Sequence, residues 1–114
     1  MPLLPPEVHT SVNEVAKHRS EDALLTCVGK NTPNSSTVVS WAFNGSHLPL
    51  DAHDDVHHVL HYVYFKEEFT PKVNFSLLIR NVTEQDTGAY HCKVLTLKGD
   101  DSDTVFLSLV EPRK

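Results

Sequence analysis

Hydrophobic and polar residues alternate with a period of two along most of this chain. Such alternation is typical of half-buried β-strands, because successive side chains of a strand point to opposite faces of the sheet. It predicts strands at residues 23–27, 39–43, 75–79, 90–94 and 104–110. The run 59–65 predicts one more strand, Asn44-Gly45 predicts a hairpin turn, and Thr83 to Asp86 has the spacing of a one-turn helical cap. We therefore expect an all-β fold.

Length and composition fit a single domain. The chain has 114 residues, of which 39% are hydrophobic, and this is enough for one buried core. We expect the domain to occupy residues 8–111. Residues 1–7 are interpreted as an N-terminal leader segment, and residues 112–114 as the start of a stalk or of a next domain.

Two cysteines, one tryptophan and a short motif form the most specific signal in the sequence. Trp41 lies between Cys27 and Cys92, and the second cysteine closes the run Asp86-Thr87-Gly88-Ala89-Tyr90-His91-Cys92. In this arrangement the chain resembles the immunoglobulin superfamily, and more narrowly its variable-type (V-set) members. The resemblance covers the chain from about Val8 to Val110, and it does not identify a ligand.

The resemblance implies an immunoglobulin-like Greek-key β-sandwich of two antiparallel sheets, joined by a Cys27–Cys92 disulfide. Trp41, Tyr90 and Asp86 should lie in its core, and the other inward side chains should be Ala23, Leu25, Val39, Phe43, Phe75, Leu77, Ile79, Val82, Val94, Val105, Leu107 and Leu109. Variable-type domains insert two extra strands, C′ and C″, after the tryptophan strand, and residues 46–72 leave room for them. The run 59–65 belongs either to these strands or to the D strand that follows.

The sequence departs from antibody-like variable domains at two places. Those domains have a Gly-x-Gly bulge at the start of the last strand, and residues 104–107 have none, which disfavours an antigen-receptor segment. Many variable-type domains also pair the acid that corresponds to Asp86 with an arginine at the start of the D strand. Here the nearest cation is Lys66, so we expect Asp86 to accept hydrogen bonds from backbone or hydroxyl groups instead.

Asparagine sequons indicate passage through the secretory pathway. Four Asn-x-Ser/Thr tripeptides begin at Asn34, Asn44, Asn74 and Asn81. Such sequons are acceptors of surface glycans in secreted proteins. We therefore expect an extracellular glycoprotein, in an oxidising compartment where a disulfide persists.

Charge and hydropathy exclude two classes of partner. The formal net charge is −5, and the chain has no basic patch or run, so we expect no nucleic-acid partner. No apolar stretch approaches the ~20 residues that span a bilayer, so we expect no membrane insertion by this segment.

Histidine-rich and acidic stretches are the main candidates for chemistry. Residues 47–61 contain His47, His53, His57, His58 and His61, with Asp51, Asp54 and Asp55. Because their spacing matches no closed zinc motif, we interpret them as a solvated connection, with a metal site and a pH sensor as alternatives. Lys98-Gly99-Asp100 resembles integrin-binding tripeptides, although it is also ordinary turn chemistry. No catalytic arrangement is present, so we expect no enzymatic activity, no metal and no cofactor.

Recognition of another protein is the expected function. Variable-type domains commonly pair through the sheet that holds the C, C′, F and G strands. In this chain that face should use the hairpin loop 96–103 and the side chains of Ala42, His91, Lys93, Leu95, Lys98, Asp100, Asp101 and Phe106. Leu95 and Phe106 are its outward apolar pair.

Three roles remain open for such a face. The first is an immune-type receptor or costimulatory ligand on the cell surface, whose partner could itself be an immunoglobulin-type domain. The second is a homophilic adhesion domain, which a weak homodimer through the same sheet would indicate. The third is an ion-channel accessory (beta) subunit, although similar subunits contain additional cysteines that this chain lacks.

Overall fold

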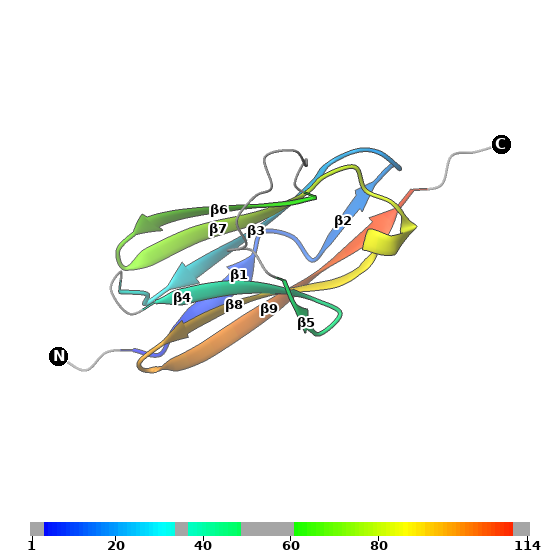
Figure 1. Cartoon of the computed structure of the whole chain (residues 1–114). Coiled ribbons are helices and arrows are strands. Elements are labelled where there is room, and N and C mark those ends of the chain that lie inside the picture. Colours follow the sequence, from blue (N-terminus) through cyan, green and yellow to red (C-terminus); the bar gives the residue numbers. More distant parts are fainter. Residues whose placement is uncertain (1–3, 34–36, 49–60, 111–114) are drawn as a thin grey trace.

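The computed structural model describes residues 4–33, 37–48 and 61–110, which form two packed β-sheets (Figure 1). The back sheet has the strand order β1-β3-β7-β6, and the front sheet has the order β2-β9-β8-β4-β5. All neighbouring strands are antiparallel except β2 and β9. The strands are β1 (Glu7–Thr10), β2 (Glu14–Lys17), β3 (Ala23–Lys30), β4 (Val38–Phe43), β5 (Ser46–His47), β6 (Tyr62–Phe69), β7 (Lys72–Ile79), β8 (Gly88–Thr96) and β9 (Gly99–Leu109).

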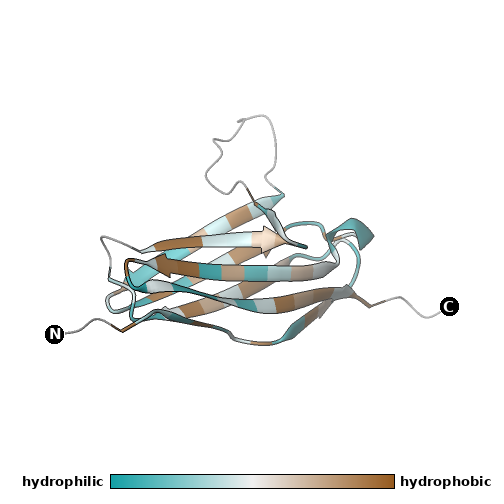
Figure 2. Cartoon of the chain, turned by 90° about the horizontal axis from the view of Figure 1, so that it is seen from below, coloured by the Kyte–Doolittle hydropathy of each residue, from teal (hydrophilic) through white to brown (hydrophobic). Residues whose placement is uncertain are grey.

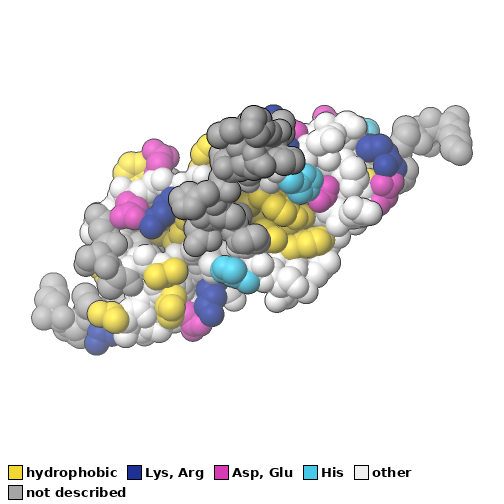
Figure 3. All heavy atoms as spheres, in the orientation of Figure 1, with side chains coloured by type: hydrophobic (Ala, Val, Ile, Leu, Met, Phe, Trp, Pro, Cys, Tyr) yellow, Lys and Arg dark blue, Asp and Glu magenta, His cyan; other side chains and the backbone are white. Residues whose placement is uncertain are grey.

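The core lies between the sheets and follows the predicted alternation. Buried and more exposed positions alternate along β3, β7 and β8. Figure 2 shows hydrophobic and polar positions interspersed along the strands. Every predicted inward side chain is buried, apart from Val39, Phe43 and Leu109, which are partly buried against the core. The predicted strand periods are therefore confirmed, including the register of the last strand. Charged side chains lie on the surface (Figure 3).

One layer of the core joins the two sheets covalently. Cys27 of β3 and Cys92 of β8 form the predicted disulfide. Trp41 is paired with Cys92 in the front sheet, and Phe75 is paired with Cys27 in the back sheet. The rings of Trp41 and Phe75 meet edge to face, with their centroids 5.7 Å apart, which is a favoured geometry for aromatic pairs. Both sheets are thus fixed to each other at the disulfide.

The segment after β4 shows to which strand the described part of the run 59–65 belongs, whereas the expected C″ strand falls outside the described residues. Asn44 and Gly45 have positive φ and form the predicted hairpin turn to β5, which has only two residues. β6 pairs with β7 in the back sheet, so the part of the run 59–65 that is described belongs to the D position. An extra C″ strand would fall within residues 49–60, which are not among the described residues.

The β8–β9 hairpin differs from the predicted loop. β8 extends to Thr96 and β9 begins at Gly99, so only Leu97 and Lys98 connect them. The expectation of a loop over residues 96–103 was wrong, because the acidic run continues the strand. Asp101 and Asp103 lie four and two positions before the inward Val105, so their side chains point to the same side of β9. There they contact β1 of the other sheet.

Two carboxylates of β9 hold β1 in place. The Oδ2 atom of Asp101 accepts a hydrogen bond from the Val8 N–H, and Oδ2 of Asp103 accepts one from the Thr10 N–H, both at 2.9 Å. Oδ1 of Asp103 also accepts from the Thr104 N–H at 2.9 Å. The hydrogen bond from Thr10 holds the pKa of Asp103 below its usual value. The charged form of Asp103 therefore stabilises the folded state.

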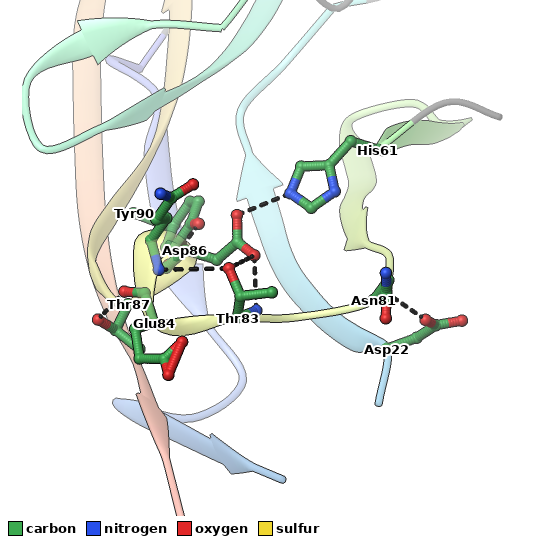
Figure 4. Close-up of polar contacts among 9 residues, drawn as sticks. Asp22, His61, Asn81, Thr83, Glu84, Asp86, Thr87 and Tyr90 are labelled. Atoms are coloured by element: carbon green, nitrogen blue, oxygen red, sulfur yellow. Dashed lines mark hydrogen bonds and ion pairs between the residues drawn. The ribbon is translucent and has the colours of Figure 1, made fainter. Parts of the chain in front are cut away.

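A polar network closes the end of the sandwich where Glu84–Asp86 forms a single 3₁₀ turn (Figure 4). Thr83 caps this turn, and its N–H donates to Oδ2 of the buried Asp86 at 2.9 Å, as expected from the sequence. The hydroxyl of Tyr90 donates to the backbone carbonyl of Asp86 at 2.6 Å. Burial raises the pKa of Tyr90, so its hydroxyl stays protonated and remains a donor.

His61 completes this network, and the sequence did not predict it. Its Nε2 atom lies 2.7 Å from Oδ1 of Asp86, just before the start of β6. Lys66, which was the nearest cation in the sequence, instead pairs with Glu68 at 2.8 Å. His61 therefore lies where an arginine is expected in similar domains. The interpretation of residues 47–61 as a solvated connection was wrong for His61, which is bound to Asp86.

Replacing Asp103 by asparagine should reduce stability and the sensitivity to acid. Asparagine has one acceptor oxygen in place of two, so it can accept from the N–H of Thr10 or of Thr104 but not from both in the present geometry. Asp103→Asn should therefore lower the free energy of unfolding at pH 7 by about 1 kcal/mol. The stabilisation from a lowered carboxyl pKa is complete above about pH 4 and is lost as the pH falls through the folded-state value. The variant should therefore lose less stability than the parent between pH 5 and pH 2, in urea unfolding. The exposed Asp100→Asn variant is the matched control, and equal acid sensitivity of the parent and the Asp103 variant would contradict the assignment.

Removing His61 should destabilise the domain, whereas removing another histidine of the same stretch should not. His61→Ala leaves one oxygen of the buried Asp86 without its partner, so it should lower the free energy of unfolding by about 1–2 kcal/mol. His47→Ala changes an exposed side chain and should stay within about 0.5 kcal/mol of the parent. His61→Arg supplies a donor at the same place and should retain the stability. Thermal unfolding of the three variants measures this, and equal losses for His61→Ala and His47→Ala would disprove the role of His61.

Candidate protein-binding surface

The outward face of the front sheet has an apolar cluster at the end of the β8–β9 hairpin. Val38 of β4 is paired with Leu95 of β8, and Leu97 follows at the hairpin tip. Their exposed fractions are 59% for Val38, 45% for Leu95 and 84% for Leu97. We call these three residues the hairpin-end cluster. Figure 3 shows hydrophobic side chains at this end of the molecule, next to basic and acidic ones.

Polar side chains occupy the middle of the same face. Nζ of Lys93 lies 3.1 Å from Oδ2 of Asp100, which is the neighbour of Leu95 across the hairpin. Nδ1 of His91 lies 2.9 Å from the hydroxyl of Thr104, and Ala42 is paired with His91. An exposed ion pair contributes little to stability, so these groups are able to exchange partners with an incoming protein.

Phe106 lies on this face but far from Leu95. It is paired with Ala89 on one side and with Glu14 on the other. Ala89 and Leu95 are six positions apart on β8, a separation of about 20 Å along a strand. The expected apolar pair of Leu95 and Phe106 therefore does not form one patch. Val38 takes the place beside Leu95, and the period of two along β4 could have predicted its outward position.

The remaining candidate residues divide between the face and the interior. Lys98 is exposed at the hairpin tip, and Asp100 is exposed on the face. Asp101 accepts the hydrogen bond from Val8 and so belongs to the contact between the sheets. It is therefore a structural residue, and its assignment to the binding loop was wrong.

The sequon asparagines lie in different structural settings. Asn44 and Asn81 have positive φ, a conformation that asparagine tolerates. Oδ1 of Asn44 accepts a hydrogen bond from the Ala89 N–H at 2.9 Å, and a Cβ atom at Gly88 would lie only 2.6 Å from that oxygen. Asn74 lies on the outward face of the back sheet, as expected, and Asn34 is outside the described residues. Glycosylation at all four positions remains a prediction.

Within residues 4–33, 37–48 and 61–110, no three His, Cys, Asp or Glu side chains are grouped so that they could hold a metal ion. His53, His57 and His58 lie outside these ranges. No helix among the described residues is long and apolar enough to cross a membrane.

Solved structures of other proteins share this fold. One is the Dpr2 Ig1-Ig2 complex with DIP-Theta Ig1-Ig3, at 21% identity and a TM-score of 0.78, covering 94% of this chain and 33% of that chain. Another is the RIG-5 IG1 homodimer, at 20% identity and a TM-score of 0.72, covering 95% of this chain and 100% of that chain. Titin domains I67-I69, in an E-to-A mutated variant, match at 18% identity and a TM-score of 0.67, covering 93% and 33%. At these identities the likeness shows the fold alone.

Sequence comparison identifies the family. No curated protein sequence matches the chain significantly. The chain spans about a third of the length of the Dpr2–DIP-Theta and titin chains that it resembles. The family model described as the immunoglobulin domain matches residues 13–105, which include both cysteines, Trp41 and the Tyr90 motif. With the two-sheet sandwich and its disulfide, this match shows that the chain belongs to the immunoglobulin domain family.

Proposed function

We propose that this domain is the extracellular recognition domain of a cell-surface receptor or ligand, of immune type. In this proposal it binds another immunoglobulin-type domain through the outward face of the front sheet, in the manner of variable-type domains. The hairpin-end cluster is the observation that carries the proposal. Val38 and Leu95 are exposed on paired strands, Leu97 is exposed at the hairpin tip that follows, and the charged Lys93 and Asp100 lie on the same face.

The composition of the face fits a specific protein interface. Such interfaces combine an apolar centre, which supplies most of the affinity, with polar groups that set orientation and association rate. Here the cluster of Val38, Leu95 and Leu97 provides the apolar part. Lys93 and Asp100 provide one charge of each sign beside it, so the face is suited to a partner with a mixed charge pattern.

Two of the structural neighbours support an immunoglobulin-type partner. The printed descriptions name a complex of Dpr2 with DIP-Theta, and a homodimer of RIG-5 IG1. Sandwiches of this kind therefore do pair with one another. The homodimer favours homophilic adhesion as the second candidate function. The third role, an ion-channel accessory subunit, has no observation in its favour.

The extracellular location in this proposal rests on two features. The disulfide persists in oxidising compartments, and the sequons fit a secreted chain.

Charge placed in the hairpin-end cluster should abolish binding. Leu95→Glu buries an unpaired carboxylate at the interface and should weaken binding at least tenfold, whereas Phe106→Ala should cost less because it lies at the other end of the face. Arg80→Ala, at the exposed residue just after β7 of the back sheet, is the control and should leave binding unchanged. The measurements are sedimentation equilibrium of the chain alone and binding to an array of immunoglobulin-type ectodomains.

Each outcome of that experiment has a definite meaning. Self-association that Leu95→Glu removes supports the homophilic role, and a heterotypic partner lost in the same variant supports the receptor role. Binding that survives Leu95→Glu but is lost in Arg80→Ala would show that the front sheet is not the binding face.

A further inference from the structure

The back sheet has an apolar patch of its own on its outward face. Leu24 of β3, Leu78 of β7 and Val63 of β6 are neighbours in one row across three strands. Phe65 of β6 lies in the next outward row, opposite Ser76. Leu24 is 53% exposed and Phe65 is 49% exposed, while Leu78 and Val63 are partly buried. We call Leu24, Val63, Phe65 and Leu78 the back-sheet patch. The patch thus offers apolar surface, chiefly from Leu24 and Phe65, that a covering group can contact.

Asn74 lies beside this patch. It is two positions from Ser76 on β7, so it is the diagonal neighbour of Phe65, at about 7–8 Å between backbones and within reach of an aromatic ring. Across the strands Asn74 is flanked by Val28 and Glu67. Its amide nitrogen is the acceptor atom of the Asn74-Phe75-Ser76 sequon, and it projects from the same face as the patch.

The local structure gives no reason for an asparagine at position 74. Asparagine is depleted in strands, and Asn74 lies in the middle of β7. Its side chain has no hydrogen-bond partner among the described residues, whereas Asn44 is held by the turn and by Ala89. Asn81 has a left-handed backbone, and its N–H donates to Asp22. Asn74 thus differs from these two sequon asparagines, whose local backbone explains them.

We propose that an N-linked glycan on Asn74 lies across the back-sheet patch, with its first sugar ring against Phe65. A pyranose ring has an apolar C–H face, which fits the negative face of an aromatic ring, and a polar rim. Its hydroxyl and acetamide groups then have partners nearby in Glu67 and in the hydroxyls of Thr26 and Ser76, which lie 3.0 Å from each other. The glycan shields the apolar row and stabilises the sheet that bears it.

This proposal is independent of the front-sheet function. The two surfaces lie on opposite sheets of the sandwich, so a glycan on the back sheet leaves the hairpin-end cluster open. A second copy of the chain, docked on the back-sheet patch, is the competing occupant. That alternative requires Asn74 to be free of sugar, because a glycan there would occupy the contact.

The test uses the whole chain, secreted from mammalian cells, in four forms. They are the parent, Asn74→Gln, Phe65→Thr and the double variant, with Ser46→Ala as the control that removes the Asn44 sequon and keeps the asparagine. Site occupancy is read by mass spectrometry. The melting temperature and the fluorescence of an apolar dye report on the patch. Trimming of the parent by an endoglycosidase to a single sugar at each site provides one further form.

The proposal predicts a coupled result. Asn74 is occupied in most molecules, and Asn74→Gln lowers the melting temperature by about 4 °C and raises dye binding severalfold, whereas Ser46→Ala changes neither. Phe65→Thr lowers the melting temperature of the glycosylated chain, and in the Asn74→Gln background it has little effect. The single-sugar form keeps most of the stabilisation.

Three results would overturn it. They are an unoccupied Asn74, an effect of Phe65→Thr that is the same with and without the glycan, and a dimer of the secreted parent chain that Phe65→Thr dissociates. The last result would assign the patch to a second copy of the chain.

Discussion

The cross-sheet disulfide and the aromatic pair beside it are the contact on which the rest of the structure depends. Cys27 and Cys92 join β3 to β8, and the partners of these cysteines in register are Phe75 and Trp41. In the chain-entropy model, a bond that closes a loop of this length contributes about 4 kcal/mol. With the centre of each sheet fixed, the alternation along every strand determines which side chains face solvent. Both candidate surfaces, front and back, follow from this one constraint.

The two ends of the sandwich are stabilised in different ways. At one end the buried carboxylate of Asp86 is hydrogen-bonded to the Thr83 N–H of its own turn and to His61, so two segments that are distant in the sequence meet there. Near the other end Asp101 and Asp103 link β9 to β1 by accepting backbone hydrogen bonds. In both places a carboxylate links segments that are distant in the sequence, through a histidine side chain at the first end and through backbone N–H groups at the second. Some of the acidic residues of this chain are therefore structural hydrogen-bond acceptors, in addition to those that lie exposed on the surface.

The sequence was sufficient to predict what depends on local pattern. The period of two predicted the strands and their inward faces, and the resemblance carried by the cysteines, the tryptophan and the tyrosine implied the sandwich and its disulfide. Contacts between distant segments could not be predicted in this way. The pairing of His61 with Asp86 depends on where β6 begins, and the contact of Asp101 with Val8 depends on β9 beginning at Gly99. The partner of Leu95 was missed because register across strands, not order along them, brings Val38 beside it.

The link between β9 and β1 has a consequence for how this domain meets other chains. The first strand has backbone donors, Val8 and Thr10, that point away from β3, and an outer strand with free donors is a template for strands of other molecules. The carboxylates of Asp101 and Asp103 occupy those donors and place negative charge along the same line. An incoming strand would have to displace both acids and lie against their charge. The β1 edge of the back sheet is therefore protected against the addition of a strand from another molecule.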